Sequence, residues 1–173
     1  MAVANARIDR ATTQAQRYWE RLYGDDPLLG SVPGVGPVIA PTIRGFLIDG
    51  SGFANAKQVC SYVGMTPSNW SSGTVDHSGR AITKEGPAVL RLAFCQAANI
   101  ARTLDPQLAE FYYRLMVAHG HCHTQATVAV ARKLIERTWT VLTRQQPYQL
   151  RDVDQTPVTA RAAKAIRDPT SMS

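Results

Sequence analysis

Cysteine and long apolar runs are both scarce in this sequence. The three cysteines, Cys60, Cys95 and Cys122, are widely spaced and form no CxxC pair. An odd number of dispersed cysteines fits free thiols in a reducing compartment better than disulfides or a thiolate zinc site. No apolar run approaches the roughly 20 residues that a membrane-spanning helix needs. The opening MAVANARIDRATTQAQ lacks the apolar core of a secretory signal, so we expect a cytoplasmic, bacterial protein.

Acidic residues are also in short supply, 13 against 19 Lys and Arg, which gives a formal net charge of +6. An excess of positive charge favours an anionic partner, nucleic acid first, although it also serves simple solubility. Apolar residues make up 45% of the chain, enough for a hydrophobic core. A length of 173 residues suits one compact domain.

Helical patterns account for most of the chain. Residues 4–23 contain neither Gly nor Pro, which predicts an N-terminal helix. Asp105 followed by Pro106 is typical of a helix start. Further helices are predicted over 37–47, 53–63, 88–104, 106–119 and 124–145. Ser51 or Gly52 is expected near the start of the 53–63 helix, and Thr124 is the candidate cap of the last one.

These elements predict an all-α fold, a helical domain with one long polar loop preceded by an N-terminal helix. The expected organisation is an N-terminal helix and linker over residues 1–27, a helical domain over 28–148, and a flexible tail over 149–173. The tail is predicted because the composition turns polar beyond residue 147.

The stretch LLGSVPGVGPVIA, residues 28–40, has the form of a helix-hairpin-helix. Gly34 and Gly36 permit a tight turn, and amides at the start of the next helix would face a phosphate. Such contacts hold a DNA strand without reading its sequence. A tight turn between packed helices is the competing interpretation, but the PGVGP setting and the basic balance favour phosphate binding.

The cluster HGHCH, with His119, His121, Cys122 and His123, contains the residue types that bind zinc. Neighbours this close in sequence rarely all point at one ion, and no second cluster of Cys or His completes a tetrahedral set. We therefore prefer a polar corner between two helices.

The polar stretch NWSSGTVDHSGRAITKEG, residues 69–86, combines small residues around Ser71 and Ser72 with nearby positive charge. The cations are Arg80, Lys84 and Arg91. A serine that attacks a phosphodiester needs an accessible hydroxyl and positive charge on the nonbridging oxygens. Composition alone favours a solvated loop. A Ser72–His77 hydrolase dyad is disfavoured because no G-x-S-x-G elbow is present.

Five segments in order are similar to the C-terminal domain of IS110/IS116/IS902-family transposases. They are SVPGVGPVIAPTI, FANAKQVCSYVGMTPSNWSSG, GRAITKEGPAVLRLAF, FYYRLMVAHG and VAVARKLIERTWTVL. The resemblance runs from about Leu28 to about Tyr148. It implies DNA as partner and a role in transposition, with a serine in this helical domain acting as nucleophile.

Residue by residue, the resemblance places Ser72 at the nucleophile, in the aromatic-x-Ser-Gly pattern that follows GMTP. Ser71 falls where the family varies and is the next candidate. The resemblance implies DNA-contact or structural roles for Lys84, Gly86 and Arg91, and phosphate contact or packing for Lys133.

Proteins of this family also carry an N-terminal RuvC-like domain whose acidic residues bind metal ions, and an RNA guides some of them. We expect no cofactor bound by this chain, a divalent metal such as Mg²⁺ at a RuvC-like domain or chain supplied in trans, and a homo-oligomer when complete. The chain is expected to be a fragment, a truncated copy or one half of a split protein, inactive alone.

The leading hypothesis is therefore a transposase domain in which Ser72 attacks DNA, Arg80 and Lys84 hold the phosphate, and the Gly34–Gly36 turn grips the backbone nearby. The alternative is a non-catalytic helix-hairpin-helix module that only binds DNA. A decayed copy that folds without activity is the third hypothesis.

Overall fold

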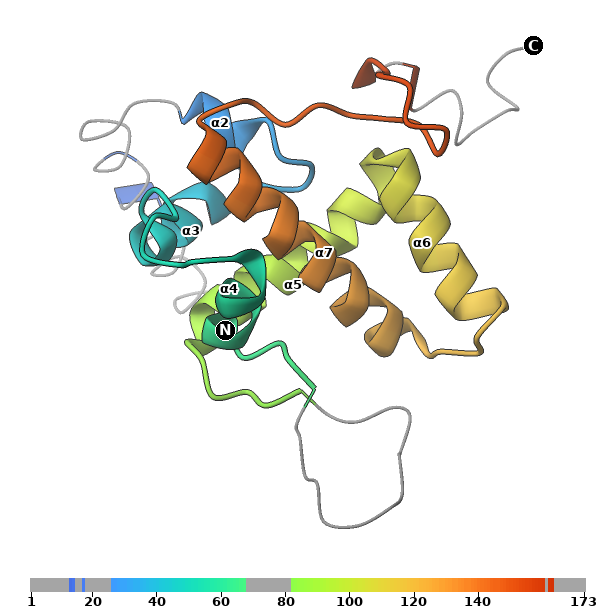
Figure 1. The fold of residues 1–173 in the computed structure, drawn as a ribbon, viewed down its shortest axis with the longest axis horizontal. Coiled ribbons are helices and arrows are strands. Elements are labelled where there is room, and N and C mark those ends of the chain that lie inside the picture. Colours follow the sequence, from blue (N-terminus) through green and yellow to red (C-terminus); the bar gives the residue numbers. More distant parts are fainter. Residues whose placement is uncertain (1–12, 15–16, 18–25, 68–81, 161, 164–173) are drawn as a thin grey trace.

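The structure, a computed structural model, describes residues 13–14, 17, 26–67, 82–160 and 162–163 (Figure 1). These residues form helices and no strand, which confirms the predicted all-α fold. The helices are α2 (Pro27–Gly30), α3 (Ile39–Leu47), α4 (Ala56–Val63), α5 (Ala88–Leu104), α6 (Pro106–Val117) and α7 (His123–Arg144). None of the helices in the described ranges is both long and apolar enough to cross a bilayer. The N-terminal helix expected over 4–23 lies almost entirely outside these ranges.

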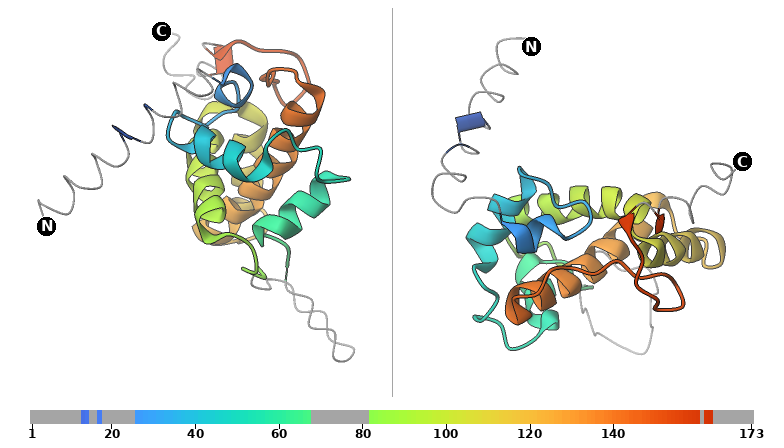
Figure 2. Two further views of the ribbon diagram at one scale, coloured as in Figure 1. Left: turned by 90° about the vertical axis from the view of Figure 1, so that its left-hand side faces the viewer. Right: turned by 90° about the horizontal axis from the view of Figure 1, so that it is seen from above.

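Helices α5 and α7 form the centre of the fold. They pack against each other, with α6 against both, and α3 lies on α5 while α4 lies on α7 (Figures 1 and 2). The predicted apolar face of α5 is confirmed, because Leu90, Phe94, Ala97 and Ala101 are all fully buried. The corresponding buried face of α7 is formed by Ala126, Val130, Ala131, Leu134, Ile135, Thr138, Val141 and Leu142.

Capping residues set the starts of three helices. Asp105 caps α6 as predicted, accepting from the Leu108 amide at 3.0 Å. Helix α4 starts later than expected, because Asn55 accepts from the Gln58 amide and takes the cap position instead of Ser51 or Gly52. Helix α7 starts two residues earlier than a Thr124 cap requires. Its N-cap is Cys122, whose amide donates to the side chain of Gln125 at 3.2 Å.

Gly34 lies in the turn between α2 and α3, where that turn meets the backbone of α5. Its φ of +79° favours glycine, and a Cβ there would lie 2.2 Å from the carbonyl oxygen of Ala97. Two residues on, Gly36 has open space where its Cβ would be. The two glycines of the GxG pattern therefore have different surroundings, and packing requires only the first.

Residues 149–160 belong to the tail that the sequence predicts, and the structure gives them specific contacts. Arg151 and Pro157 form an isolated antiparallel bridge, and Val158 donates to the carbonyl of Leu150 at 3.0 Å. The Gln107 side chain of α6 donates to the carbonyl of Asp152 at 2.9 Å. The first part of this segment is thus tied to α6. The three domain boundaries stay a prediction.

Candidate functional site

The segment 68–81 holds the predicted nucleophile, and it lies outside the described residues. Ser71, Ser72, His77 and Arg80 all fall within it, so their roles stay predictions. The structure does describe the two stems, residues 64–67 and 82–86, where the chain enters and leaves this segment. The stems therefore show how the base of the candidate site is held.

The two stems are joined by backbone hydrogen bonds. The Thr83 amide donates to the Thr66 carbonyl at 3.0 Å, and the Lys84 amide donates to the Gly64 carbonyl at 3.1 Å. Pro67 and Ile82 form an isolated antiparallel bridge at the far end of this pairing. The entry and exit of segment 68–81 are therefore held side by side (Figure 1).

Two glycines let the stems meet more closely than any other residue would allow. A Cβ on Gly86 would lie 1.9 Å from the Tyr62 carbonyl oxygen, and one on Gly64 would lie 2.7 Å from the Gly86 amide nitrogen. Gly64 also has a φ of +74°, which suits the residue that ends α4. The resemblance gave Gly86 a DNA-contact or structural role, and its surroundings are those of a packing residue.

Arg91 binds the same junction from the first turn of α5. Its Nη1 donates to the carbonyl oxygens of Val63, at 3.2 Å, and Gly86, at 3.1 Å. One guanidinium thus holds the last turn of α4 to the outgoing stem, where its charge also suits the negative end of the helix. Together, the backbone pairing, the two glycines and Arg91 form what we call the stem clamp.

The other cations that the sequence singled out have different surroundings. Lys84 is exposed on the outgoing stem and has a φ of 58°. Its ammonium group forms no ion pair with any described residue. Lys133 is half-buried, with its Nζ 4.9 Å from the centre of the Phe111 ring, a cation–π distance. Packing is thus one role of Lys133, and phosphate contact stays a prediction for both lysines.

Few backbone amides at the start of α3 are available to donate to a phosphate. Ile39 and Ala40 both donate to the Gly36 carbonyl, at 3.0 and 2.9 Å, and Pro37 has no amide hydrogen to donate. The amides of Gly36 and Val38 make no hydrogen bond to any described residue. A phosphate at this turn would therefore meet two donors rather than a full helix terminus. Phosphate binding by the Gly34–Gly36 turn stays a prediction.

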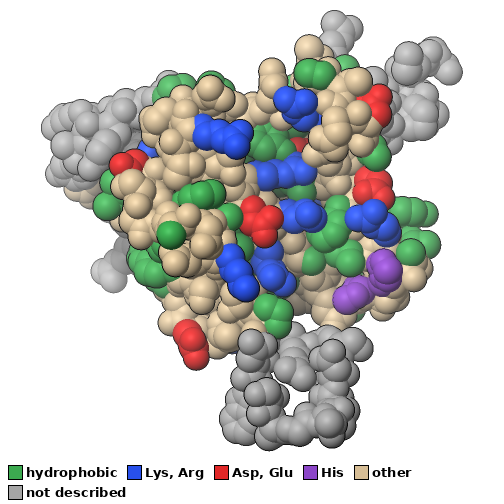
Figure 3. Space-filling view, in the orientation of Figure 1, with side chains coloured by type: hydrophobic (Ala, Val, Ile, Leu, Met, Phe, Trp, Pro, Cys, Tyr) green, Lys and Arg blue, Asp and Glu red, His purple; other side chains and the backbone are tan. Residues whose placement is uncertain are grey.

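Lys and Arg side chains gather over α7 and its neighbours on one face of the molecule (Figure 3). On α7, Lys133, Arg137 and Arg144 recur at intervals of four and seven residues, which places them on one side of the helix. Arg132 directly precedes Lys133 in the sequence and therefore faces a different side of α7. Neither Arg132 nor Arg144 forms an ion pair with a described residue. This basic face is a suitable surface for a polyanion.

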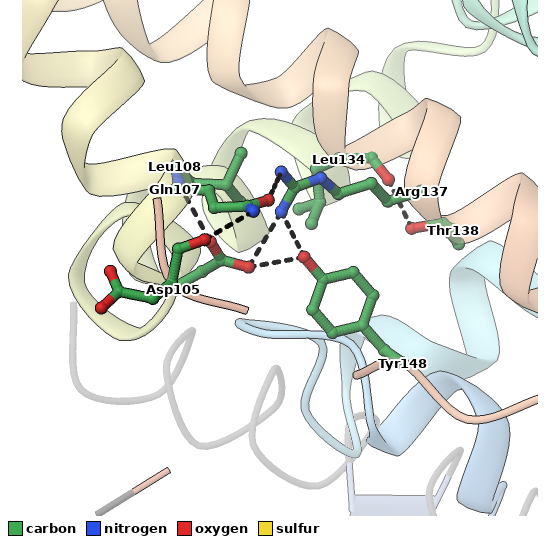
Figure 4. A network of polar contacts seen from close by, with 8 residues as sticks. Asp105, Gln107, Leu108, Leu134, Arg137, Thr138 and Tyr148 are labelled. Carbon is green, nitrogen blue, oxygen red and sulfur yellow. Dashed lines mark hydrogen bonds and ion pairs between the residues drawn. The ribbon is translucent and has the colours of Figure 1, made fainter. Parts of the chain in front are cut away.

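Arg137 is the exception on this face, because a buried carboxylate already binds it (Figure 4). Its Nη1 lies 2.9 Å from Oδ2 of Asp105, whose side chain is fully buried, and its Nη2 donates to Gln107 at 2.8 Å. The Tyr148 hydroxyl donates to the same Asp105 oxygen at 2.5 Å and also contacts Arg137. Burial raises the pKa of the Tyr148 hydroxyl above its usual value, so it stays protonated. This network joins α6, α7 and the following segment.

A cavity of about 530 Å³ opens beside the stem clamp, between α4, α7 and the two stems. It is lined by Lys57, Cys60, Ser61, Thr66, Pro67, Thr83, Glu85, Arg132 and Glu136. Burial raises the pKa of the Cys60 thiol to about 11, and the charge of Glu136 adds to the rise. Cys60 is therefore a protonated lining group and not a nucleophile near neutral pH. Sequence reasoning missed this site, because its residues come from separate segments and form no motif.

The HGHCH cluster lies at the corner between α6 and α7. His123 Nδ1 is 2.6 Å from the Tyr112 hydroxyl, and the rings of His119 and His121 meet edge to face at 6.4 Å. Within the described ranges, no three His, Cys, Asp or Glu side chains are arranged to hold a metal ion. The cluster lies between two helices, where the sequence placed a polar corner, and the exclusion of a metal site stays a prediction.

A family model and individual relatives both match this chain over most of its helical region. The family model described as Transposase IS116/IS110/IS902 family matches residues 26–113. The Pilin gene-inverting protein of Moraxella lacunata is 31% identical over 125 residues, which are 72% of this chain and 38% of that protein. The insertion element IS110 43.6 kDa protein of Streptomyces coelicolor is 34% identical over 116 residues, 67% of this chain and 28% of that protein. The chain therefore spans between 28% and 38% of the length of these relatives.

Proposed function

The chain belongs to the IS116/IS110/IS902 family of transposases, and on that premise we propose that it serves DNA transposition or recombination by supplying a serine nucleophile, Ser72. The observation that carries the proposal is the stem clamp. It fixes the entry and exit of segment 68–81 next to a polar cavity that contains two cationic side chains, Lys57 and Arg132. A nucleophile loop on a rigid base meets the need for a well-positioned attacking group.

In the proposed step, Oγ of Ser72 attacks the phosphorus of a DNA phosphodiester. The Oγ–P bond forms while the bond from phosphorus to one deoxyribose oxygen breaks. The serine proton passes to a base or to water, and the released deoxyribose oxygen takes up a proton. The product is a phosphoserine ester to one DNA end, which a hydroxyl of another strand can attack in turn. Cations such as Arg80 and Lys84 would stabilise the charge that develops on the nonbridging oxygens.

The proposal places further parts of the reaction outside this chain. In this proposal, a divalent metal is held by a RuvC-like domain or chain acting in trans. No step of the serine chemistry above is assigned to that metal. A guide RNA and assembly into a homo-oligomer are part of the same proposal.

Ser72→Ala will abolish covalent capture of DNA, a loss of about a thousandfold or more, because no other group replaces a missing nucleophile efficiently. The measurement uses end-labelled DNA with the RuvC-like partner supplied in trans, followed by denaturing electrophoresis to detect the protein–DNA ester. Ser71→Ala is the matched control and will retain capture. Capture that persists in Ser72→Ala and disappears in Ser71→Ala would transfer the role to Ser71.

The alternative function is a helix-hairpin-helix module that only binds DNA. The observation in its favour is that the amides of Gly36 and Val38, in front of α3, make no hydrogen bond to any described residue. Gly36→Ala will test it cleanly, because a methyl group there meets no atom within 4 Å, whereas one at Gly34 meets α5. If the turn grips phosphate, Gly36→Ala will weaken duplex binding about three- to tenfold, by interfering with a hydrogen-bonded phosphate. Fluorescence anisotropy across a salt series measures this effect. Unchanged binding would remove the turn from the DNA interface.

A further inference from the structure

We propose that the cavity between α4, α7 and the two stems binds a single nucleotide of the DNA strand, with its phosphate on Arg132 and Lys57. This inference rests on the proposed function for the identity of the strand, and it adds to that function a recognition site. The cavity volume of about 530 Å³ lies within the roughly 300–1,000 Å³ of small-ligand sites. Its lining is built from both stems, so a nucleotide bound there would lie directly at the base of segment 68–81.

Two buried polar atoms of the lining residues make no hydrogen bond to any residue that the structure describes. Thr83 Oγ1 and Arg132 Nε are both buried, and neither makes a hydrogen bond. Buried polar groups are almost always satisfied, and an unsatisfied one destabilises the fold. A ligand whose acceptor oxygens reached these atoms would satisfy them. A phosphate offers such oxygens and accepts strongly from guanidinium donors.

The charges of the cavity lining are also unpaired. Lys57 and Arg132 contribute positive charge, and Glu85 and Glu136 contribute negative charge. None of the four forms an ion pair within 4.0 Å with any described residue. Charged side chains that share a cavity without pairing are free to bind a ligand.

The presence of both signs decides which ligand fits. A bare phosphate would be attracted by two cations and repelled by two carboxylates in the same cavity. A nucleotide brings an anionic phosphate together with hydrogen-bond donors on its base, and carboxylates accept from base amino groups. A metal ion is disfavoured because Lys57 and Arg132 would repel it, and the described residues offer no three-ligand set. The lining therefore suits a nucleotide better than either simple ion.

The Thr83 hydroxyl gives the sharpest test, because the fold does not use it. Thr83→Val keeps the side-chain shape and removes only the unpartnered hydroxyl, so thermal stability will be unchanged or higher. The same variant will bind a fluorescein-labelled single-stranded oligodeoxynucleotide about five- to tenfold more weakly than the wild-type chain, because a hydrogen bond to a charged group is lost. Fluorescence anisotropy at fixed salt concentration measures the affinity.

Thr127→Val is the matched control. Thr127 Oγ1 is likewise buried without a partner, but Thr127 does not line the cavity. Like Thr83→Val, Thr127→Val will have unchanged or higher thermal stability. Unlike Thr83→Val, it will bind the labelled oligodeoxynucleotide with the affinity of the wild-type chain. A second pair separates specific contact from overall charge: Arg132→Met will weaken binding about tenfold or more, and Arg144→Met, which removes the same charge from the same helix, will weaken it less.

Each outcome decides a separate point. Equal affinities of wild type and Thr83→Val, or equal losses in Arg132→Met and Arg144→Met, would overturn the cavity assignment and leave Ser72 as the proposed nucleophile. Equal binding of an oligodeoxycytidylate, whose bases carry amino groups, and an abasic strand of the same length would reduce the site to a phosphate site and overturn the nucleotide assignment. A wild-type chain that binds neither strand would overturn this inference together with DNA binding by the chain. Ser72→Ala, tested in parallel, will bind the oligodeoxynucleotide with wild-type affinity. Loss of covalent capture in that variant can therefore be distinguished from loss of DNA binding.

Discussion

Asp105→Ala will lower the free energy of unfolding by about 3–5 kcal/mol, because removing one partner of a buried ion pair leaves the other uncompensated. The Asp105 carboxylate is fully buried and has three tasks. It caps α6 through the Leu108 amide, binds Arg137 at 2.9 Å, and accepts from the Tyr148 hydroxyl at 2.5 Å. Alanine would remove all three at once and leave Arg137, with a quarter of its side chain exposed, without its counter-charge.

Urea denaturation followed by circular dichroism will measure this change. Glu110→Ala is the control, because Glu110 pairs with Arg114 at 3.6 Å on the exposed side of α6. Exposed pairs of this kind contribute less than about 0.5 kcal/mol. A loss below about 1 kcal/mol in Asp105→Ala would show that the network of Figure 4 contributes little to stability.

Gly86→Ala will have the second large effect, a loss of about 3 kcal/mol of stability together with loss of covalent DNA capture. The new methyl group would lie 1.9 Å from the Tyr62 carbonyl oxygen and 2.5 Å from the Val63 carbonyl carbon. Both are backbone atoms, so no side-chain rotation relieves the overlap, and overpacking of this kind costs about 1–3 kcal/mol or more. The stems must separate, which breaks the clamp that positions segment 68–81.

Thermal denaturation and the capture assay described for Ser72 will measure the two parts of this prediction. Gly45→Ala is the matched control, since a methyl group there meets no atom within 4 Å. Gly45 lies inside α3, where alanine is favoured over glycine by about 0.5–1 kcal/mol, so this variant will be as stable as wild type or more so. Wild-type stability and capture in Gly86→Ala would mean that the stems tolerate separation.

Patterns that are local in sequence predicted the helices well. The spacing of Leu90, Phe94, Ala97 and Ala101 is enough to define the buried face of α5, because a helix repeats every 3.6 residues whatever it packs against. The Asp105–Pro106 pair likewise predicts the start of α6 from local sequence alone, because the aspartate side chain accepts from an amide of the first turn. The exact cap residue is harder to predict where several candidate residues stand close together in the sequence. Asn55 and Cys122 take the cap positions of α4 and α7 in place of the predicted residues.

Properties that depend on distant segments could not be predicted in this way. Gly34 and Gly36 look alike in the sequence, and only the position of Ala97 on α5 makes one of them indispensable for packing. Arg91 was predicted to have a DNA-contact or structural role, and only the fold shows that its guanidinium donates to the carbonyls of Val63 and Gly86. The cavity is the extreme case, because Thr83 and Arg132 come together only through the fold.

The stem clamp is made almost entirely of main-chain atoms. Amides and carbonyls of the stems pair with each other, Gly64 and Gly86 contribute no side chain, and Arg91 binds carbonyl oxygens rather than side chains. These contacts do not depend on the identity or number of the residues inserted between the stems. The residues between the stems can therefore change without a compensating change in the helices that support the stems. The stem clamp therefore supports its insert through backbone contacts that many different inserted sequences would leave intact.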